Sequence, residues 1–138
     1  GAQWTNIEEE KYLSRHDLTG RTVLVDCVTL WTTNFFFDYM PQQSSPVSNP
    51  SDTVESRQAQ AGIRQVEETL QTVKEEFLRF TSQKATFIFV TNEIGMGGVS
   101  TNEVQRRVTD LLGWTNQFVA SQADEVYLMV SGIPVKIK

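Results

Sequence analysis

Three short runs of apolar and β-branched residues mark the chain, and segments with helical spacing separate them. The runs cover residues 22–28, 85–91 and 125–131, and each is nearly continuous, as in strands buried on both faces of a sheet. Between Ile63 and Phe80, apolar side chains recur at every third or fourth position, which predicts a helix before the second run. Another helix of about 20 residues is predicted from Ser100, because Ser100 and Glu103 have the spacing of a capping box.

This alternation of strands and helices predicts an α/β fold, a parallel sheet with helices on both faces. The tail 132–138 predicts a short final strand after a glycine turn, at a sheet edge because of Pro134. Glu8 to Glu10 precede Tyr12 and Leu13, which indicates one short helix near the start. Residues 1–138 are expected to form a single domain, and the Pro-, Ser- and Gln-rich stretch 40–53 is expected to be a mobile surface loop.

Composition narrows the possible partners. Of 138 residues, 39% are apolar and 21% charged, as in an average globular domain, and the net charge of −5 argues against a nucleic-acid partner. No apolar run is long enough to cross a membrane, so no membrane span is expected. A single cysteine excludes an internal disulfide and fits the reducing cytoplasm. With one cysteine and one histidine, a zinc site built on these ligands is excluded within one chain.

Polar residues at the carboxyl ends of the first two predicted strands are candidates for ligand binding. Asp26 lies near the carboxyl end of the first run, where nucleotide-binding α/β proteins hold magnesium. The alternative is a capping or turn aspartate. After the second run, the segment 91–98 has polar groups and then closely spaced glycines, which permit close backbone approach to a ligand. The candidate ligand loop consists of Thr91, Asn92, Glu93, Gly95 and Gly97, and the alternative is a flexible connection.

Other conspicuous residues have simpler interpretations. Trp31 with Phe35, Phe36 and Phe37 indicates core or a subunit interface. His16 is interpreted as a solvated histidine at a helix end, and Cys27 as inert packing in a buried strand. Arg106, Arg107 and Asp110 fit the solvated face of the last long helix. The chain contains no G-x-x-x-x-G-K-[ST] phosphate loop and no G-x-S-x-G nucleophile motif.

Several segments together resemble one known family. They are Val23–Trp31 with Asn34, the string T-N-E-I-G-M-G at 91–97, Arg106–Arg107 with Asp110–Leu111 and Asn116–Gln117, and the run 123–138. In order and spacing they resemble the bifunctional adenosylcobinamide kinase / adenosylcobinamide-phosphate guanylyltransferases of cobalamin biosynthesis. The resemblance covers nearly the whole chain except 40–53 and the helix after it.

The resemblance implies a RecA-like P-loop fold, a homotrimer and a cytoplasmic enzyme. Such an enzyme phosphorylates adenosylcobinamide with ATP or GTP and then transfers GMP from GTP, through a histidine–GMP intermediate, to give adenosylcobinamide-GDP. By position, Asp26 matches the acid near the nucleotide and Mg²⁺, and Glu8 matches a glutamate that contacts GTP.

One departure from the family pattern limits what is expected of this chain. In the family, the first strand, the phosphate loop and the guanylylated histidine precede the segment that matches Trp4, and His16 does not match that histidine. The chain therefore resembles the carboxyl-terminal two thirds or more of the enzyme, with the N-terminal strands missing and no catalytic residue of its own, and alone it is expected to be inactive. The alternatives are a non-catalytic oligomerising or scaffold α/β domain and an unrelated α/β nucleotide-binding protein.

Overall fold

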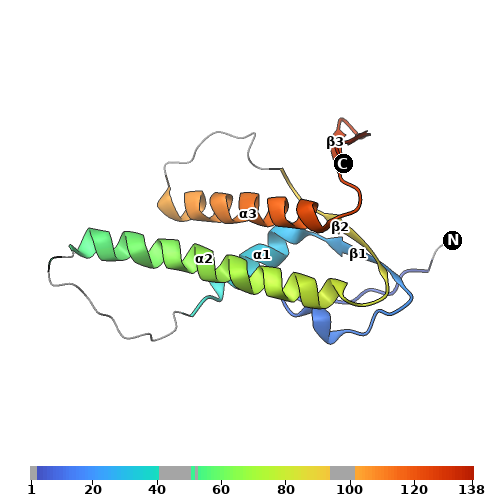
Figure 1. Ribbon diagram of the computed structural model, residues 1–138, viewed down its shortest axis with the longest axis horizontal. Helices are drawn as coiled ribbons and strands as arrows, with labels where there is room; N and C mark the ends of the chain where they lie inside the picture. Colours follow the sequence, from blue (N-terminus) through green and yellow to red (C-terminus); the bar gives the residue numbers. More distant parts are fainter. Residues whose placement is uncertain (1–2, 41–50, 52, 94–101) are drawn as a thin grey trace.

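A computed structural model describes residues 3–40, 51, 53–93 and 102–138 of the chain. Long helices lie beside a small sheet, and a separate hairpin follows the last helix (Figure 1). In chain order the elements are η1 (Leu13–Arg15), β1 (Thr22–Asp26), α1 (Val28–Phe37), α2 (Val54–Thr81), β2 (Thr86–Val90), α3 (Glu103–Gln122), β3 (Tyr127–Val130) and β4 (Ile133–Lys136).

The first two predicted strands pair in parallel, as expected. Thr22 lies opposite Thr86, and the register continues without a break to Asp26 opposite Val90. Parallel strands need a crossover connection, and here α1 and α2 lie between the two strands in the chain. Both strands therefore end at the same edge of the sheet.

The helices cover one face of this sheet, and the prediction of helices on both faces is wrong for the described residues. Phe87 and Phe89 of β2 contact Phe80 and Phe77 of α2, with ring centroids 4.9 and 5.0 Å apart. On the opposite face Leu24 and Ile88 are 47% and 48% exposed. The strand runs are apolar on both faces, but only one face finds helices to pack against, so the expectation of full burial also fails.

The third predicted strand does not join the parallel sheet. It pairs in antiparallel fashion with the tail, Val130 opposite Ile133, as a separate two-stranded sheet. Ser131 and Gly132 have φ of 51° and 77°, and two consecutive residues with positive φ form the tight turn that suits a two-residue hairpin. Local turn geometry thus pairs β3 with β4. The expected glycine turn and final edge strand are confirmed, while the parallel pairing of residues 125–131 is wrong.

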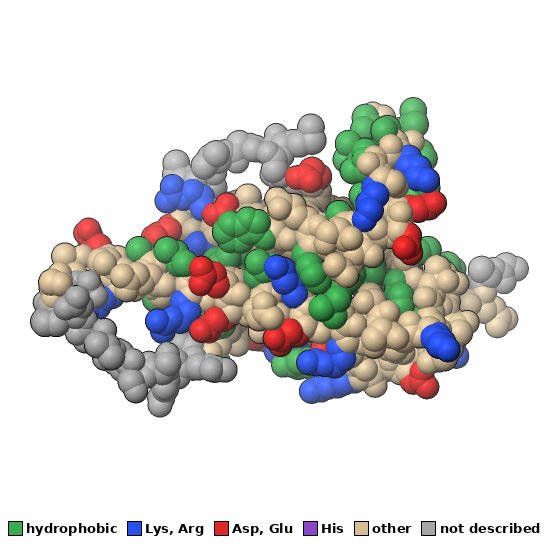
Figure 2. Space-filling view, viewed as in Figure 1, with side chains coloured by type: hydrophobic (Ala, Val, Ile, Leu, Met, Phe, Trp, Pro, Cys, Tyr) green, Lys and Arg blue, Asp and Glu red, His purple; other side chains and the backbone are tan. Residues whose placement is uncertain are grey.

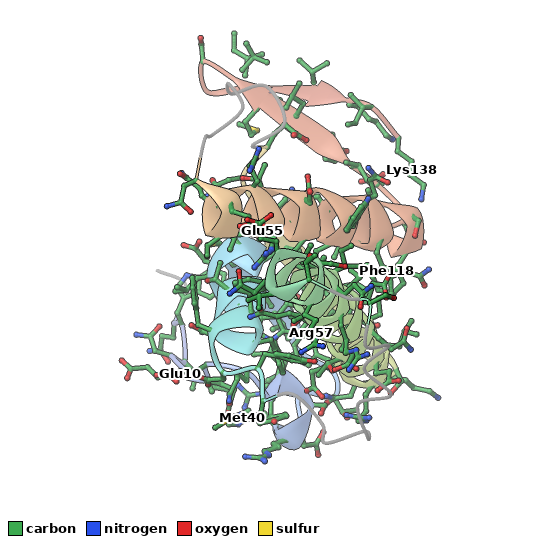
Figure 3. The ribbon with its side chains drawn as sticks, turned by 90° about the vertical axis from the view of Figure 1, so that its left-hand side faces the viewer. Glu10, Met40, Glu55, Arg57, Phe118 and Lys138 are labelled. Carbon is green, nitrogen blue, oxygen red and sulfur yellow. The ribbon has the colours of Figure 1, made fainter. Side chains whose placement is uncertain are left out.

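The hairpin stands apart from the helical layer (Figure 3). Lys138 Nζ donates to the carbonyl oxygens of Ala120 and Ser121 at the end of α3, at 2.9 and 3.2 Å. Most apolar side chains of the hairpin are exposed, and they gather at the upper right of the space-filling view (Figure 2). These residues are Tyr127, Met129, Val130, Ile133, Val135 and Ile137.

The two long helices differ from prediction mainly at their starts. The α2 helix spans 28 residues and begins at Val54, with the Thr53 hydroxyl accepting from the Ser56 amide at 3.1 Å. The predicted capping box is wrong: Asn102 caps α3 by accepting from the Gln105 amide at 3.2 Å. Ser100 lies outside the described residues, as do 41–50 and 52 of the predicted mobile loop. No helix in the described ranges is long and apolar enough to cross a membrane.

Close packing of α2 on α3 half-buries one residue that was expected to be solvated. Arg107 donates to Glu103 at 2.8 Å, and its side chain is 23% exposed. Its guanidinium lies where a β-carbon on Gly62 would sit, with the Arg107 Cζ only 2.2 Å from that position. Arg106 and Asp110 are exposed, as expected.

The core forms where α1 meets α2 and α3. Trp31 and Phe35 of α1 pack with Val73 and Phe77 of α2 and with Val119 of α3. The interpretation of the aromatic group as core is confirmed for Trp31, Phe35 and Phe36. Phe37 is 67% exposed and contacts Phe36 edge-on, so it lies outside the core.

Candidate functional site at the carboxyl edge of the sheet

Asp26 and the candidate ligand loop meet at one edge of the sheet. Asp26 ends β1 directly opposite Val90, and Thr91, Asn92 and Glu93 follow immediately. The prediction that these residues share one edge is therefore confirmed. Gly95 and Gly97 lie outside the described residues. Because β1 stops at Asp26 and α1 begins at Val28, Asp26 is at a strand end, and Cys27 is the N-terminal flanking residue of α1.

Cys27 is therefore not inside a buried strand as interpreted. It lies in the connection from β1 to α1 and is partly exposed, with a free thiol. Thr29, two positions further, is in the first turn of α1 and faces the start of the loop after β2: its hydroxyl lies 3.4 Å from the Asn92 amide, which donates to it.

A second link to this edge comes from α3 through one side-chain amide. Thr91 Oγ1 donates to Asn116 Oδ1 at 2.6 Å, and Asn116 Nδ2 donates to the carbonyl oxygen of Asn92 at 2.9 Å. The residues directly after β2 are thus held by α1 on one side and by α3 on the other. Sequence reasoning gave Asn116 no role, since a polar residue on an amphipathic helix is indistinguishable from a solvated one.

The donors at this edge fit one type of magnesium binding. Asp26 is exposed and makes no hydrogen bond or ion pair within the described part of the chain, so its carboxylate is available to a ligand. No group of three or more Asp, Glu, His or Cys side chains that could hold a metal occurs among the described residues. Two carboxylates, Asp26 and Glu93, beside neutral oxygen donors fit a Mg²⁺ that keeps waters and is held mainly by substrate phosphates. They do not fit a cage made of protein ligands alone.

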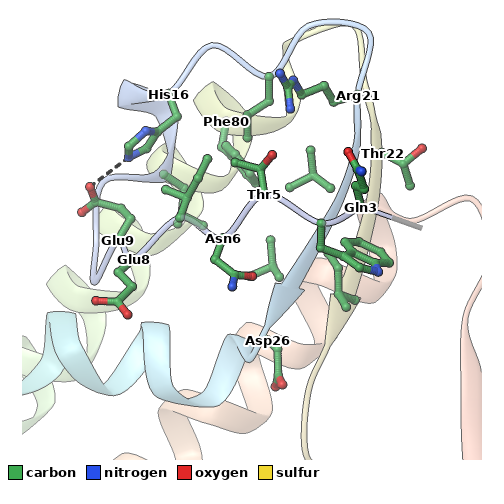
Figure 4. Close-up of a pocket in the computed structure, with 17 residues that line it drawn as sticks. Gln3, Thr5, Asn6, Glu8, Glu9, His16, Arg21, Thr22, Asp26 and Phe80 are labelled. Atoms are coloured by element: carbon green, nitrogen blue, oxygen red, sulfur yellow. Dashed lines mark hydrogen bonds and ion pairs between the residues drawn. The ribbon is translucent and has the colours of Figure 1, made fainter. Parts of the chain in front are cut away.

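A cavity of about 810 Å³ lies between β1 and the N-terminal segment 3–9, along the side of β1 that does not pair with β2. Glu8 and Asp26 both line it (Figure 4). No strand pairs with this edge of β1 in the part of the chain that the structure describes. Glu8 is exposed, so the two residues that the family resemblance assigns to nucleotide and metal border one open space.

His16 also lines this cavity, and its interpretation as a solvated residue at a helix end is confirmed only in part. It follows η1, as a helix-end residue, but Nε2 lies 3.2 Å from Glu9 Oε2 and the side chain is 35% exposed. Glu9 Oε1 accepts from the backbone amides of Lys11 and Tyr12 at 3.2 and 3.0 Å. These bonds, with the contact to His16, lower the pKa of Glu9 below its ordinary value of 4.5.

The α1 helix fixes the segment that carries Glu8 and Glu9. Trp31 Nε1 donates to the carbonyl oxygen of Lys11 at 2.7 Å, and Asn34 Nδ2 donates to that of Glu10 at 3.0 Å. Lys11 Nζ in turn pairs with Asp38 just beyond the helix, at 2.7 Å. The helix that begins directly after Asp26 therefore also positions the opposite wall of the cavity.

Parallel strands that bring an acid and a polar loop to their shared carboxyl edge are characteristic of α/β proteins that bind nucleotides. Sequence comparison identifies the family of this chain. The chain belongs to the family described as cobinamide kinase / cobinamide phosphate guanyltransferase, whose match covers residues 1–137.

Curated relatives carry names that agree with this family. The bifunctional adenosylcobalamin biosynthesis protein CobU of Escherichia coli K12 is 32% identical over 137 residues, which are 99% of this chain and 67% of that protein. CobP of Pseudomonas aeruginosa is 30% identical over 142 residues, with the same shares covered. CobU of Salmonella typhimurium is 35% identical over 116 residues, 84% of this chain and 58% of that protein. The chain thus spans about two thirds of the first two relatives.

Proposed function

We propose that this chain carries part of the nucleotide site of a cobalamin-biosynthesis enzyme that phosphorylates adenosylcobinamide with ATP or GTP. The same enzyme would transfer GMP from GTP to give adenosylcobinamide-GDP. The observation that carries the proposal is the juxtaposition of Asp26 with Thr91–Glu93 at one sheet edge, in a chain that belongs to this family over residues 1–137. The names of the relatives support a role in adenosylcobalamin biosynthesis.

Asp26 would hold the Mg²⁺ of the bound nucleotide. When bound, that ion would offset the negative charge of the phosphates during transfer. The exposed Asp26 carboxylate needs no rearrangement for this role, since it has no competing partner among the described residues. Thr91, Asn92 and Glu93, with Gly95 and Gly97 beyond the described range, are the proposed ligand loop, and Glu8 is proposed to contact the nucleotide from across the cavity.

The chain by itself is proposed to be inactive. Phosphoryl transfer depends on groups that cradle the phosphates, and the 138 residues contain no phosphate-loop motif and no match to the guanylylated histidine. We also propose that the enzyme is a homotrimer, as the family resemblance implies, and that it works in the cytoplasm without a nucleic-acid partner. The exposed apolar face of β1 and β2 supports association with further polypeptide.

That same surface favours a second candidate function. A non-catalytic oligomerising or scaffold domain would also expose Leu24 and Ile88 to a partner, but it would have no use for a free Asp26 carboxylate. The two functions therefore differ in what they expect from a substitution at Asp26.

The experiment uses the natural protein that contains this chain, assayed for GTP-dependent phosphorylation of adenosylcobinamide. We expect Asp26→Asn to lower turnover by about 100-fold or more while the far-ultraviolet circular dichroism is unchanged. Asp110→Asn is the matched control, because Asp110 is an exposed aspartate on α3 with no assigned role. Turnover that is equal in wild type and Asp26→Asn would refute the role of Asp26, and no turnover in the wild type would favour the scaffold.

A further inference from the structure

We propose that Asn116 is a positioning residue that holds the backbone after β2 in the conformation used for nucleotide binding. The proposal rests on the proposed function and adds a residue on α3 that touches neither Asp26 nor Glu8. Asn116 acts through Thr91 and Asn92, with hydrogen bonds of 2.6 and 2.9 Å. We call this pair of bonds made by Asn116 the α3 latch.

The chemistry of the latch requires both ends of one amide. Asn116 Oδ1 accepts from the Thr91 hydroxyl while Nδ2 donates to the Asn92 carbonyl oxygen. A primary amide offers an acceptor and a donor in one plane, so the two bonds define a single orientation of the side chain. An aspartate of the same shape would keep the acceptor but would turn a negative oxygen towards the Asn92 carbonyl.

The latch acts on Asn92, whose backbone is also bound by a side chain of a second helix. The amide of Asn92 donates to Thr29 Oγ1 at 3.4 Å, and Thr29 is in the first turn of the helix that starts after Asp26. The carbonyl oxygen and the amide of Asn92 thus bind side chains from two different helices. The direction in which the chain leaves β2, beside Asp26, follows from these contacts.

The bonds of the latch are exposed, so their effect on global stability is small compared with their effect on local geometry. A preorganised loop loses less conformational entropy when a ligand binds, and this advantage disappears when the anchor is removed. The α3 latch is therefore expected to change ligand affinity more than melting temperature.

The test measures amide hydrogen exchange at residues 91–93 and the affinity for GTP in the presence of Mg²⁺. The natural protein that contains this chain is compared with Asn116→Ala, Asn116→Asp, Thr91→Val and the double variant Thr91→Val/Asn116→Ala. Gln117→Ala is the control, because Gln117 is the exposed neighbour on the same helix. We expect exchange at Asn92 to rise about tenfold and GTP affinity to fall about tenfold in both Asn116 variants, with the melting temperature within one degree or so of the control.

The double variant separates a shared role from two independent ones. If Thr91 and Asn116 act through one bond, Thr91→Val/Asn116→Ala binds GTP no more weakly than Asn116→Ala alone. Unchanged exchange at residues 91–93 in Asn116→Ala would overturn the latch. Faster exchange with unchanged GTP affinity would overturn its positioning role. A wild-type protein that binds no GTP would refute the proposed function, and hydrogen exchange would still decide whether the latch exists.

Discussion

The backbone amide of Ser14 donates to the carboxylate of Glu76, with 2.8 Å between Ser14 N and Glu76 Oε1. The bond joins the short η1 helix to the C-terminal part of α2 across 62 positions of sequence. Glu76 is 2% exposed, and its other oxygen accepts from Arg79 Nη1 at 2.9 Å. A buried carboxylate with both oxygens paired thus fastens the N-terminal segment, which forms one wall of the cavity, to the helical core.

Removal of Glu76 is expected to destabilise the protein strongly. Glu76→Ala leaves the Ser14 amide without its acceptor and opens a void at a buried position of α2, for a loss of about 3 kcal/mol in the free energy of unfolding. Urea denaturation, monitored by tryptophan fluorescence, measures this loss. Glu75→Ala is the control, since Glu75 is exposed on the same helix and should cost about 0.5 kcal/mol or less. Equal midpoints for the two variants would contradict the structural role of Glu76.

The contribution of Glu9 to the stability of the fold should depend on pH. Its pKa is below the ordinary 4.5 because the carboxylate accepts from the Tyr12 and Lys11 amides and contacts His16. A depressed folded-state pKa stabilises the fold at pH values above 4.5, and this contribution is lost as the pH falls through the lowered pKa. Glu9→Gln should therefore lower the melting temperature at neutral pH, and the difference from wild type should shrink in acid.

The matched control for the pH experiment is Glu10→Gln, because Glu10 is an exposed neighbour whose side chain makes no hydrogen bond in the described structure. Melting temperatures of the wild type and both variants are compared across the acid range. A difference between Glu9→Gln and wild type that stays constant with pH would mean that the Glu9 bonds do not depend on its charge.

Nucleotide binding by the isolated 138-residue chain is expected to be weak. The chain supplies Asp26 and Glu8 but no phosphate-loop motif, so few contacts reach the phosphates. We expect a dissociation constant for GTP with Mg²⁺ of about 1 mM or weaker. Titration calorimetry measures it, and micromolar affinity would show that this chain alone forms a complete site.

The isolated chain is also expected to associate. The sheet has unpaired edges and one exposed apolar face in the described structure, and the hairpin exposes Ile133 and Val135. The double variant Ile133→Lys/Val135→Lys should lower the mass measured by light scattering. The control Gln58→Lys/Gln60→Lys adds the same charge on exposed positions of α2. A monomer at high concentration for the unmodified chain would contradict the prediction.

The sequence determined the order of the strands and of the two long helices, the parallel pairing of the first two strands and the shared edge of Asp26 and Thr91–Glu93. It could do so because apolar periodicity records local conformation, and crossover rules then fix the direction of neighbouring strands. The family resemblance likewise rested on residues that can be read in order along the chain.

The tertiary structure decided which groups meet across long stretches of chain. Sequence could not show that residues 127–130 would pair with the tail, because an apolar run does not specify its partner strand. The tight turn at Ser131–Gly132 brings the tail beside this run, so the two pair. It also could not show that His16 faces Glu9 or that Asn116 binds the backbone after β2, 24 positions away. Such contacts depend on how helices pack on the sheet, and a polar residue on a helix gives the same local signal whether water or a distant backbone group is its partner.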